Sequence, residues 1–122
     1  MVKTEVKKSK IHGLGVFALE DIAKGTVIEV CYMIPFPKKD IALIKKTFLN
    51  NYYFEWLNGG GAVALGNGSI YNHSYEPNAE YLGNEKKNIT KFVAIKPIKK
   101  GQEIFTSYNG DAKRKEKVWF DK

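Results

Sequence analysis

Residues 72–79 read Asn-His-Ser-Tyr-Glu-Pro-Asn-Ala and place three hydrogen-bonding side chains in succession within a stretch rich in turn-forming residues. Such a cluster can be a buried hydrogen-bonded knot, a ligand-binding site or, at His73, a general base. Nucleophilic catalysis by Ser74 is unattractive, because adjacent residues of an extended chain point to opposite faces and His73 would not readily reach the Ser74 hydroxyl. The stretch therefore predicts either a structural knot or a binding site.

An N-terminal segment, residues 12–18, reads His-Gly-Leu-Gly-Val-Phe-Ala and fits the loose glycine pattern of dinucleotide-binding turns. A dinucleotide turn must open a helix, whereas the residues after Gly15 are strand-like and lead into another turn. Two glycines that flank one residue still expose backbone groups to a close-packed ligand, because no Cβ stands in the way. A plain turn with glycine at positive φ is the competing interpretation.

A C-terminal segment, residues 101–108, leads from a turn through a predicted strand to Tyr108, which could also be a core residue with a hydrated hydroxyl. Residues 26–34 are apolar or β-branched on both parities, which predicts a strand buried on both faces, and residues 89–96 predict another strand. Between residues 39 and 56, apolar residues follow helical spacing and predict one helix. The pattern is that of a mainly β protein.

The length of 122 residues fits one domain that can just bury its own core. The longest apolar stretch, residues 27–36, is far shorter than the roughly 20 residues that cross a bilayer, so no membrane partner is expected. The charged N-terminus lacks the apolar run of a secretory signal, which predicts an intracellular protein. One cysteine and two histidines form no cluster at metal-ligand spacing, so no metal is expected.

The net charge of +7 lies at the two ends of the chain. Residues 1–12 hold four lysines against one glutamate, and residues 96–122 hold eight basic residues against four acids. Only Arg114 is an arginine, so any nucleic acid would be bound through its phosphates rather than by bidentate contacts to bases. A solubilising surface with a basic tail explains the same charges.

Taken in order, the segments over residues 12–18, 72–79 and 101–108 resemble the motifs of the SET-domain protein-lysine methyltransferases, in the minimal form of small viral and bacterial SET proteins. The resemblance spans residues 3–111 as a SET domain and leaves residues 112–122 as a basic C-terminal tail. It implies a mainly β fold of the β-clip type, with several small sheets, a C-terminal pseudoknot and one or two short helices.

The resemblance also implies an activity, which is the transfer of methyl groups from S-adenosylmethionine to a lysine side chain of a protein. In this family the backbone of Gly13, Leu14 and Gly15 would hold the methionine part of this donor. The Asn72 side chain would bind its amino-acid moiety, and the His73 backbone its adenine. No metal is expected to take part.

Two tyrosines are the expected catalytic residues by the same resemblance. The Tyr108 hydroxyl would lie near the transferring methyl group and also contact the donor, and its role would be alignment rather than base catalysis, since a phenol has a reference pKa near ~10. Tyr52 would line the channel for the target lysine, with Tyr53 in its place if the alignment shifts by one residue.

Three further channel residues are expected, each at a departure from the family pattern. Thr106 stands two residues before Tyr108, where many relatives carry Phe or Tyr, and this leaves mono-, di- and trimethylation open. The chain lacks a cysteine-rich C-terminal module, so Trp119 or Phe120 could close the channel, although a disordered tail explains them equally well. Asn109 also separates Tyr108 from the glycine that often follows it directly.

The expected partner is a protein with an exposed lysine, for which a histone tail is a candidate at the level of the family. Nucleic acid held by the basic ends and a second copy of the chain are further candidate partners. The location would be the cytoplasm of a bacterium, or a host nucleus for a viral or eukaryotic protein. The alternative function is a catalytically degenerate SET fold that binds protein or nucleic acid.

Overall fold

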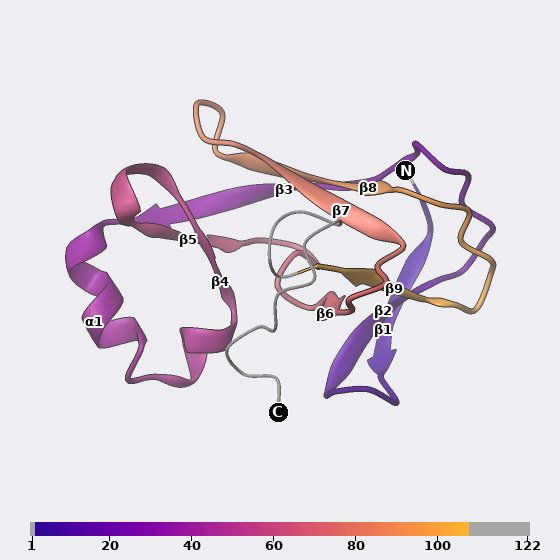
Figure 1. The fold of residues 1–122 in the computed structure, drawn as a ribbon, viewed down its shortest axis with the longest axis horizontal. Helices are drawn as coiled ribbons and strands as arrows, with labels where there is room; N and C mark the ends of the chain where they lie inside the picture. The colour runs from indigo at the N-terminus through magenta and orange to yellow at the C-terminus, as the bar shows by residue number, and fades with distance from the viewer. Residues whose placement is uncertain (1, 108–122) are drawn as a thin grey trace.

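The computed structural model describes residues 2–107, which form nine strands and a few short helical segments (Figure 1). The strands are β1 (Thr4–Lys8), β2 (Leu14–Ala18), β3 (Val27–Phe36), β4 (Tyr53–Glu55), β5 (Gly61–Ala64), β6 (Asn72–His73), β7 (Ala79–Asn84), β8 (Ile89–Ala94) and β9 (Glu103–Thr106). The helical segments are the single-turn α1 (Ile41–Ile44) and three 3₁₀ turns, η1 (Lys38–Asp40), η2 (Phe48–Asn51) and η3 (Leu57–Gly59).

The strands form two small sheets. One has the order β1-β2-β9-β6 and the other the order β4-β5-β3-β8-β7. All strand pairs are antiparallel except β6 and β9, which run parallel. Because β9, the last described strand, lies between β2 and β6, it connects the N-terminal strands to β6 in the middle of the chain. The mainly β prediction, with several small sheets and few short helices, is confirmed.

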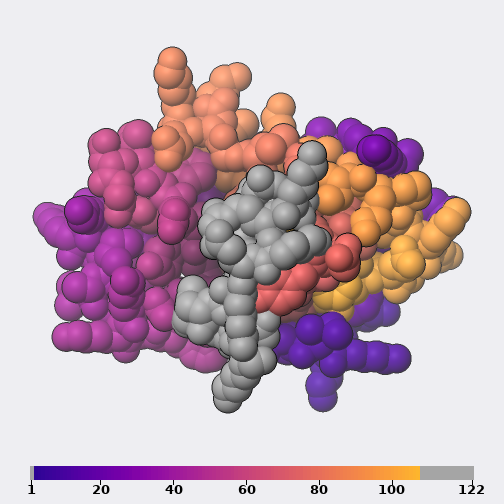
Figure 2. All heavy atoms as spheres, viewed as in Figure 1, coloured from indigo at the N-terminus to yellow at the C-terminus, as the bar shows by residue number. Residues whose placement is uncertain are grey.

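The early and late segments of the described chain lie at the same end of the molecule. In Figure 2 the N-terminal residues in indigo and the C-terminal strand region in orange and yellow share one end, whereas the magenta residues between β3 and β6 form the other. Within residues 2–107, no helix combines the length and the apolar character needed to cross a bilayer.

The strand predicted over residues 26–34 is present as β3, but the prediction that both its faces are buried is wrong. Cys31 and Met33 point into the core, whereas Val30, Tyr32 and Ile34 are exposed. Side chains of a strand alternate between faces, and no other described segment buries the outer face. Apolar residues on both parities therefore reflect an apolar outer face rather than a strand between two layers.

The helix predicted between residues 39 and 56 is present only as short turns. Thr47 is extended, at φ −113° and ψ 168°, and its hydroxyl accepts from the Leu49 N–H while donating to the Ile44 carbonyl. Thr47 thus separates α1 from η2 and caps the start of η2. Phe48 and other apolar residues here stay exposed, so little tertiary packing supports a longer helix.

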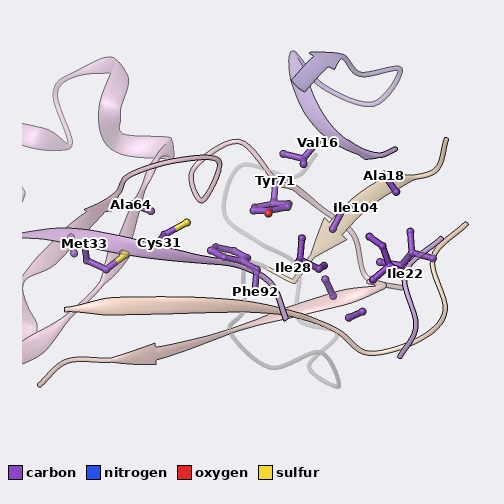
Figure 3. Close-up of a cluster of buried hydrophobic side chains, with 14 of the residues drawn as sticks. Val16, Ala18, Ile22, Ile28, Cys31, Met33, Ala64, Tyr71, Phe92 and Ile104 are labelled. Carbon is purple, nitrogen blue, oxygen red and sulfur yellow. The ribbon is translucent and has the colours of Figure 1, made fainter. Parts of the chain in front are cut away.

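The hydrophobic core connects the two sheets. Val16 of β2 and Ile104 of β9 belong to the same buried cluster as Ile28 of β3 and Phe92 of β8 (Figure 3). The Tyr71 ring stacks on Phe92, with ring centroids 4.5 Å apart. Tyr71 directly precedes β6, so its burial fixes where that strand begins.

The Glu29 carboxylate, at the edge of this core, accepts hydrogen bonds from the segment before β6. The Tyr71 hydroxyl donates to the half-buried Glu29 carboxylate, and the Asn67 N–H donates to it at 3.4 Å. Burial, and then the hydrogen bond and charge of Glu29, raise the pKa of the Tyr71 hydroxyl. Burial and the nearby Glu29 charge raise the pKa of the Cys31 thiol to about 12. Both groups are therefore protonated at neutral pH.

Tyr71→Phe should lower the free energy of unfolding by about 1–3 kcal/mol, because it removes a donor from a half-buried carboxylate. Tyr32→Phe is the matched control, since Tyr32 is 70% exposed and its change should stay within about 0.5 kcal/mol. Urea denaturation at neutral pH measures both. Equal stability of Tyr71→Phe and the wild type would mean that this hydrogen bond does not hold the segment.

Candidate functional site

The insertion of β9 between β2 and β6 brings the three sequence motifs together. On one side Val16 of β2 faces Ile104 of β9, and on the other His73 of β6 faces Thr106. The Ser74 N–H also donates to the Thr106 carbonyl at 2.9 Å. Residues from the first, middle and last thirds of the chain therefore meet at one place.

The Asn72 side chain lies at the centre of this meeting point and is 5% exposed. Its Nδ2 atom donates to the His12 carbonyl at 3.0 Å, the Leu14 carbonyl at 3.1 Å and the Glu103 Oε2 atom at 2.8 Å. Among the described residues, none donates a hydrogen bond to the other end of the amide, Oδ1. Asn72 thus connects the glycine turn to β9 and keeps one acceptor available.

The glycine turn above Asn72 is open on its outer side. Gly13 has a φ of +48°, a conformation that favours glycine, and a Cβ at Gly13 would meet nothing within 4 Å. Leu14 is 56% exposed, and the Ser9 N–H closes the turn by donating to the Gly13 carbonyl at 2.8 Å. The turn directs two carbonyls inward to Asn72 and leaves its outer backbone accessible.

Gly15 is required for a different reason, which is close approach. A Cβ at Gly15 would overlap the Glu103 Oε2 atom and lie 3.2 Å from the Asn72 Nδ2 atom. The Glu103 carboxylate therefore occupies the space that a side chain at position 15 would fill. Its other oxygen, Oε1, accepts from the Ser9 hydroxyl at 2.7 Å.

His73 and Thr106 form the next step of the parallel pair. The His73 ring packs edge-on against Tyr75, with centroids 4.4 Å apart, and Thr106 is 2% exposed. Asn78 then fixes β9 from outside the pair, since its Nδ2 donates to the Glu103 carbonyl at 2.9 Å and its Oδ1 accepts from the Phe105 N–H at 2.8 Å.

The two candidate channel tyrosines differ in their surroundings. Tyr52 is 36% exposed and stacks on Phe48 at a centroid distance of 5.9 Å, and its carbonyl accepts from the Ser69 hydroxyl at 3.0 Å. Ser69 lies three residues before Asn72, so this bond connects the aromatic segment to the stretch of chain that leads into β6. Tyr53 belongs to β4 and packs edge-on against Phe36 at 5.5 Å.

Three predicted site residues, Tyr108, Trp119 and Phe120, lie outside the described residues. Of the others, the structure brings Gly13, Leu14 and Gly15 together with Asn72, and it pairs His73 with Thr106. Sequence reasoning gave no role to Ser9, Asn78 or Glu103. Two of these residues stood within the quoted motifs, but a lone serine between two lysines carries no recognisable signal.

The fold is shared with the crystal structure of a Plasmodium falciparum protein assigned as a histone methyltransferase. That structure is 33% identical, with a TM-score of 0.72, and the match covers 88% of this chain and 94% of the other. The family model described as SET domain matches residues 13–109. The chain therefore belongs to the SET-domain family.

A curated relative from Schizosaccharomyces pombe, the histone-lysine N-methyltransferase specific for histone H3 lysine-37, is 33% identical over 118 residues. The match covers 96% of this chain and 76% of that protein.

Gly15→Ala should disrupt this site, because its Cβ would push the Glu103 carboxylate away from Asn72. We expect a loss of about 1–3 kcal/mol in unfolding free energy and a shifted side-chain amide resonance of Asn72 in ¹H–¹⁵N spectra. Gly25→Asn is the control, since a Cβ there meets nothing within 4 Å and Asn tolerates its φ of +89° better than other residues. An unmoved Asn72 resonance in Gly15→Ala would contradict the close approach.

Proposed function

We propose that this chain transfers methyl groups from S-adenosylmethionine to a lysine side chain of a protein substrate. The observation that carries the proposal is the buried Asn72 amide, whose Nδ2 atom is fully engaged while its Oδ1 atom accepts no hydrogen bond from the described residues. The Oδ1 atom is not among the fully buried, unpaired polar atoms of the described residues, so a ligand can reach this acceptor and supply the donor. An ammonium group, such as that of the methionine moiety, is a suitable donor.

The residues around Asn72 fit this methyl donor. The turn of Gly13, Leu14 and Gly15 is exposed at its first two residues and would offer backbone groups to the methionine part, and the His73 backbone would contact the adenine. When bound, S-adenosylmethionine supplies an electrophilic methyl group on a sulfonium centre. The protein must then align a neutral lysine amine with that methyl group and keep water away from it.

Tyr52 is the better of the two candidates for the lysine channel. Its link to Ser69 ties it to the segment that leads into Asn72, whereas Tyr53 is engaged with Phe36 in the sheet. An aromatic channel of low polarity lowers the pKa of the target lysine, which favours the amine needed for attack. The π faces of the rings also accommodate the cation that forms.

Tyr108 is the proposed catalytic tyrosine that contacts the donor and the transferring methyl group, two residues beyond Thr106. Trp119 or Phe120 would close the channel, and the division into a SET domain over residues 3–111 and a tail over residues 112–122 is part of the same proposal. Thr106, a small buried residue, would leave room beside the methylated amine for more than one product.

A histone is the first substrate class to test, because the S. pombe relative is named for histone H3. If a histone is the substrate in the cell, the protein would act in a nucleus. Nucleic-acid binding by the basic ends and formation of a homodimer stay predictions. A catalytically degenerate SET fold is the outcome that the next two experiments would reveal.

S-adenosylhomocysteine, the demethylated product of the donor, should bind the wild type in calorimetry. Asn72→Ala should lower the affinity for S-adenosylhomocysteine about 10- to 100-fold. The reason is that a hydrogen bond to a charged group contributes about 1.5–3 kcal/mol. Glu85→Gln, a change at an exposed surface residue, should bind as the wild type does. A folded wild type that binds neither donor nor product would refute the enzyme.

Tyr108→Phe should reduce methyl transfer about 10²- to 10³-fold while donor binding changes little, because it removes one oriented dipole and keeps the ring. Mass spectrometry after incubation with isotopically labelled donor and a panel of histones and lysine-rich proteins measures the transfer. The wild type should label lysine side chains. Turnover of Tyr108→Phe equal to that of the wild type in a single-turnover experiment would remove Tyr108 from the mechanism.

A further inference from the structure

The Glu103 carboxylate connects the Asn72 amide to Ser9, which lies just before the glycine turn. Its Oε2 atom accepts from the Asn72 Nδ2 atom at 2.8 Å, and its Oε1 atom accepts from the Ser9 hydroxyl at 2.7 Å. The Ser9 oxygen in turn accepts from the Ile11 N–H at 3.0 Å, at the start of the glycine turn. A single carboxylate therefore fixes both the amide beneath the turn and the chain that leads into the turn.

The charge of Glu103 also decides which end of the Asn72 amide faces the turn. Three oxygen atoms surround the Nδ2 position, from His12, Leu14 and Glu103, and only the last belongs to a carboxylate. Rotating the amide by half a turn would place Oδ1 against all three, with the strongest repulsion from the carboxylate. The charge-assisted bond is also the shortest of the three, as expected for an ionised acceptor.

Glu103 has little freedom to move away from this position. Its backbone is held in β9 between β2 and β6, and its carbonyl accepts from Asn78. The absent Cβ at Gly15 creates the space for its carboxylate, and the Ser9 hydroxyl holds the outer oxygen. The carboxylate is thus fixed on three sides before any ligand arrives, which is how preorganised sites gain affinity.

We propose that Glu103, held by Ser9, is a positioning residue that directs the Asn72 Oδ1 atom toward the ammonium group of the methyl donor. This inference rests on the proposed function and deepens it by assigning two residues to recognition of the donor's amino group. The negative charge behind the amide also favours a cation at the Oδ1 end. Glu103 acts through Asn72 and has no role in the methyl transfer itself.

The test uses two ligands, S-adenosylhomocysteine and its analogue in which hydrogen replaces the amino group. For the wild type, calorimetry should give a dissociation constant about 10- to 100-fold higher for the analogue than for S-adenosylhomocysteine, since the analogue lacks the group that Oδ1 binds. Glu103→Gln keeps the size of the side chain and removes its charge. It should raise the dissociation constant of S-adenosylhomocysteine at least fivefold and leave that of the analogue nearly unchanged. The ratio of the analogue's constant to that of S-adenosylhomocysteine should therefore fall.

Ser9→Ala provides a second variant that retains the Glu103 charge, and it should lower the ratio by a smaller factor. Glu85→Gln is the control for loss of one acidic charge and should keep the wild-type ratio. A general distortion of the site would lower the affinity for both ligands by a similar factor and leave the ratio unchanged. A wild-type ratio in folded Glu103→Gln overturns the inference, and if that variant does not fold, a wild-type ratio in Ser9→Ala overturns it.

The outcomes also separate this inference from the proposed function. If the wild type binds neither ligand, the proposed function fails. If it binds S-adenosylhomocysteine with a strong preference over the analogue and Glu103→Gln preserves that preference, only the role of Glu103 fails.

Discussion

The hydrogen bonds of one buried amide, that of Asn72, hold together segments that are distant in the sequence. Asn72 and the His12 carbonyl lie 60 positions apart, and Asn72 and Glu103 lie 31 apart. Burying an amide is unfavourable unless its polar atoms find partners, so the N-terminal turn and β9 must both reach Asn72 in the folded state. The parallel pairing of the two-residue strand β6 with β9 is the backbone counterpart of this constraint.

The core and the site meet at neighbouring residues. Tyr71 enters the core, stacks on Phe92 and bonds the Glu29 carboxylate, while Asn72 faces the glycine turn. Opposite directions for adjacent side chains are what an extended backbone provides. The position of the amide therefore depends on the packing of the ring beside it. The candidate site is thus built directly on the core, without a separate supporting layer.

Much of the fold was predictable because the three motifs are local in sequence. The strands β3, β8 and β9 follow from β-branched runs between turn residues, and the turn at Gly13 follows from its glycine pattern. The resemblance implied a C-terminal pseudoknot, but no local pattern indicated the long-range pairing of β9 with β6. Periodicity by itself does not reveal which strands meet.

The errors have identifiable physical causes. Helical spacing in residues 39–56 did not produce a long helix, because the Thr47 hydroxyl satisfies backbone groups on both of its sides. Apolar residues on both parities of β3 indicated burial, yet one face stays exposed in the described part of the chain. The role of Ser9 could not be predicted, because it depends on a carboxylate 94 positions away.

The central claim is that the amide of Asn72 and the glycine turn form the site for the methyl donor. Titration with S-adenosylhomocysteine, followed by ¹H–¹⁵N NMR spectra, tests it most directly. The account predicts that the largest shifts fall on the Asn72 side-chain amide and on the backbone amides of Gly13, Leu14 and Gly15. Saturable shifts confined to another part of the molecule, such as residues 38–51, would contradict it.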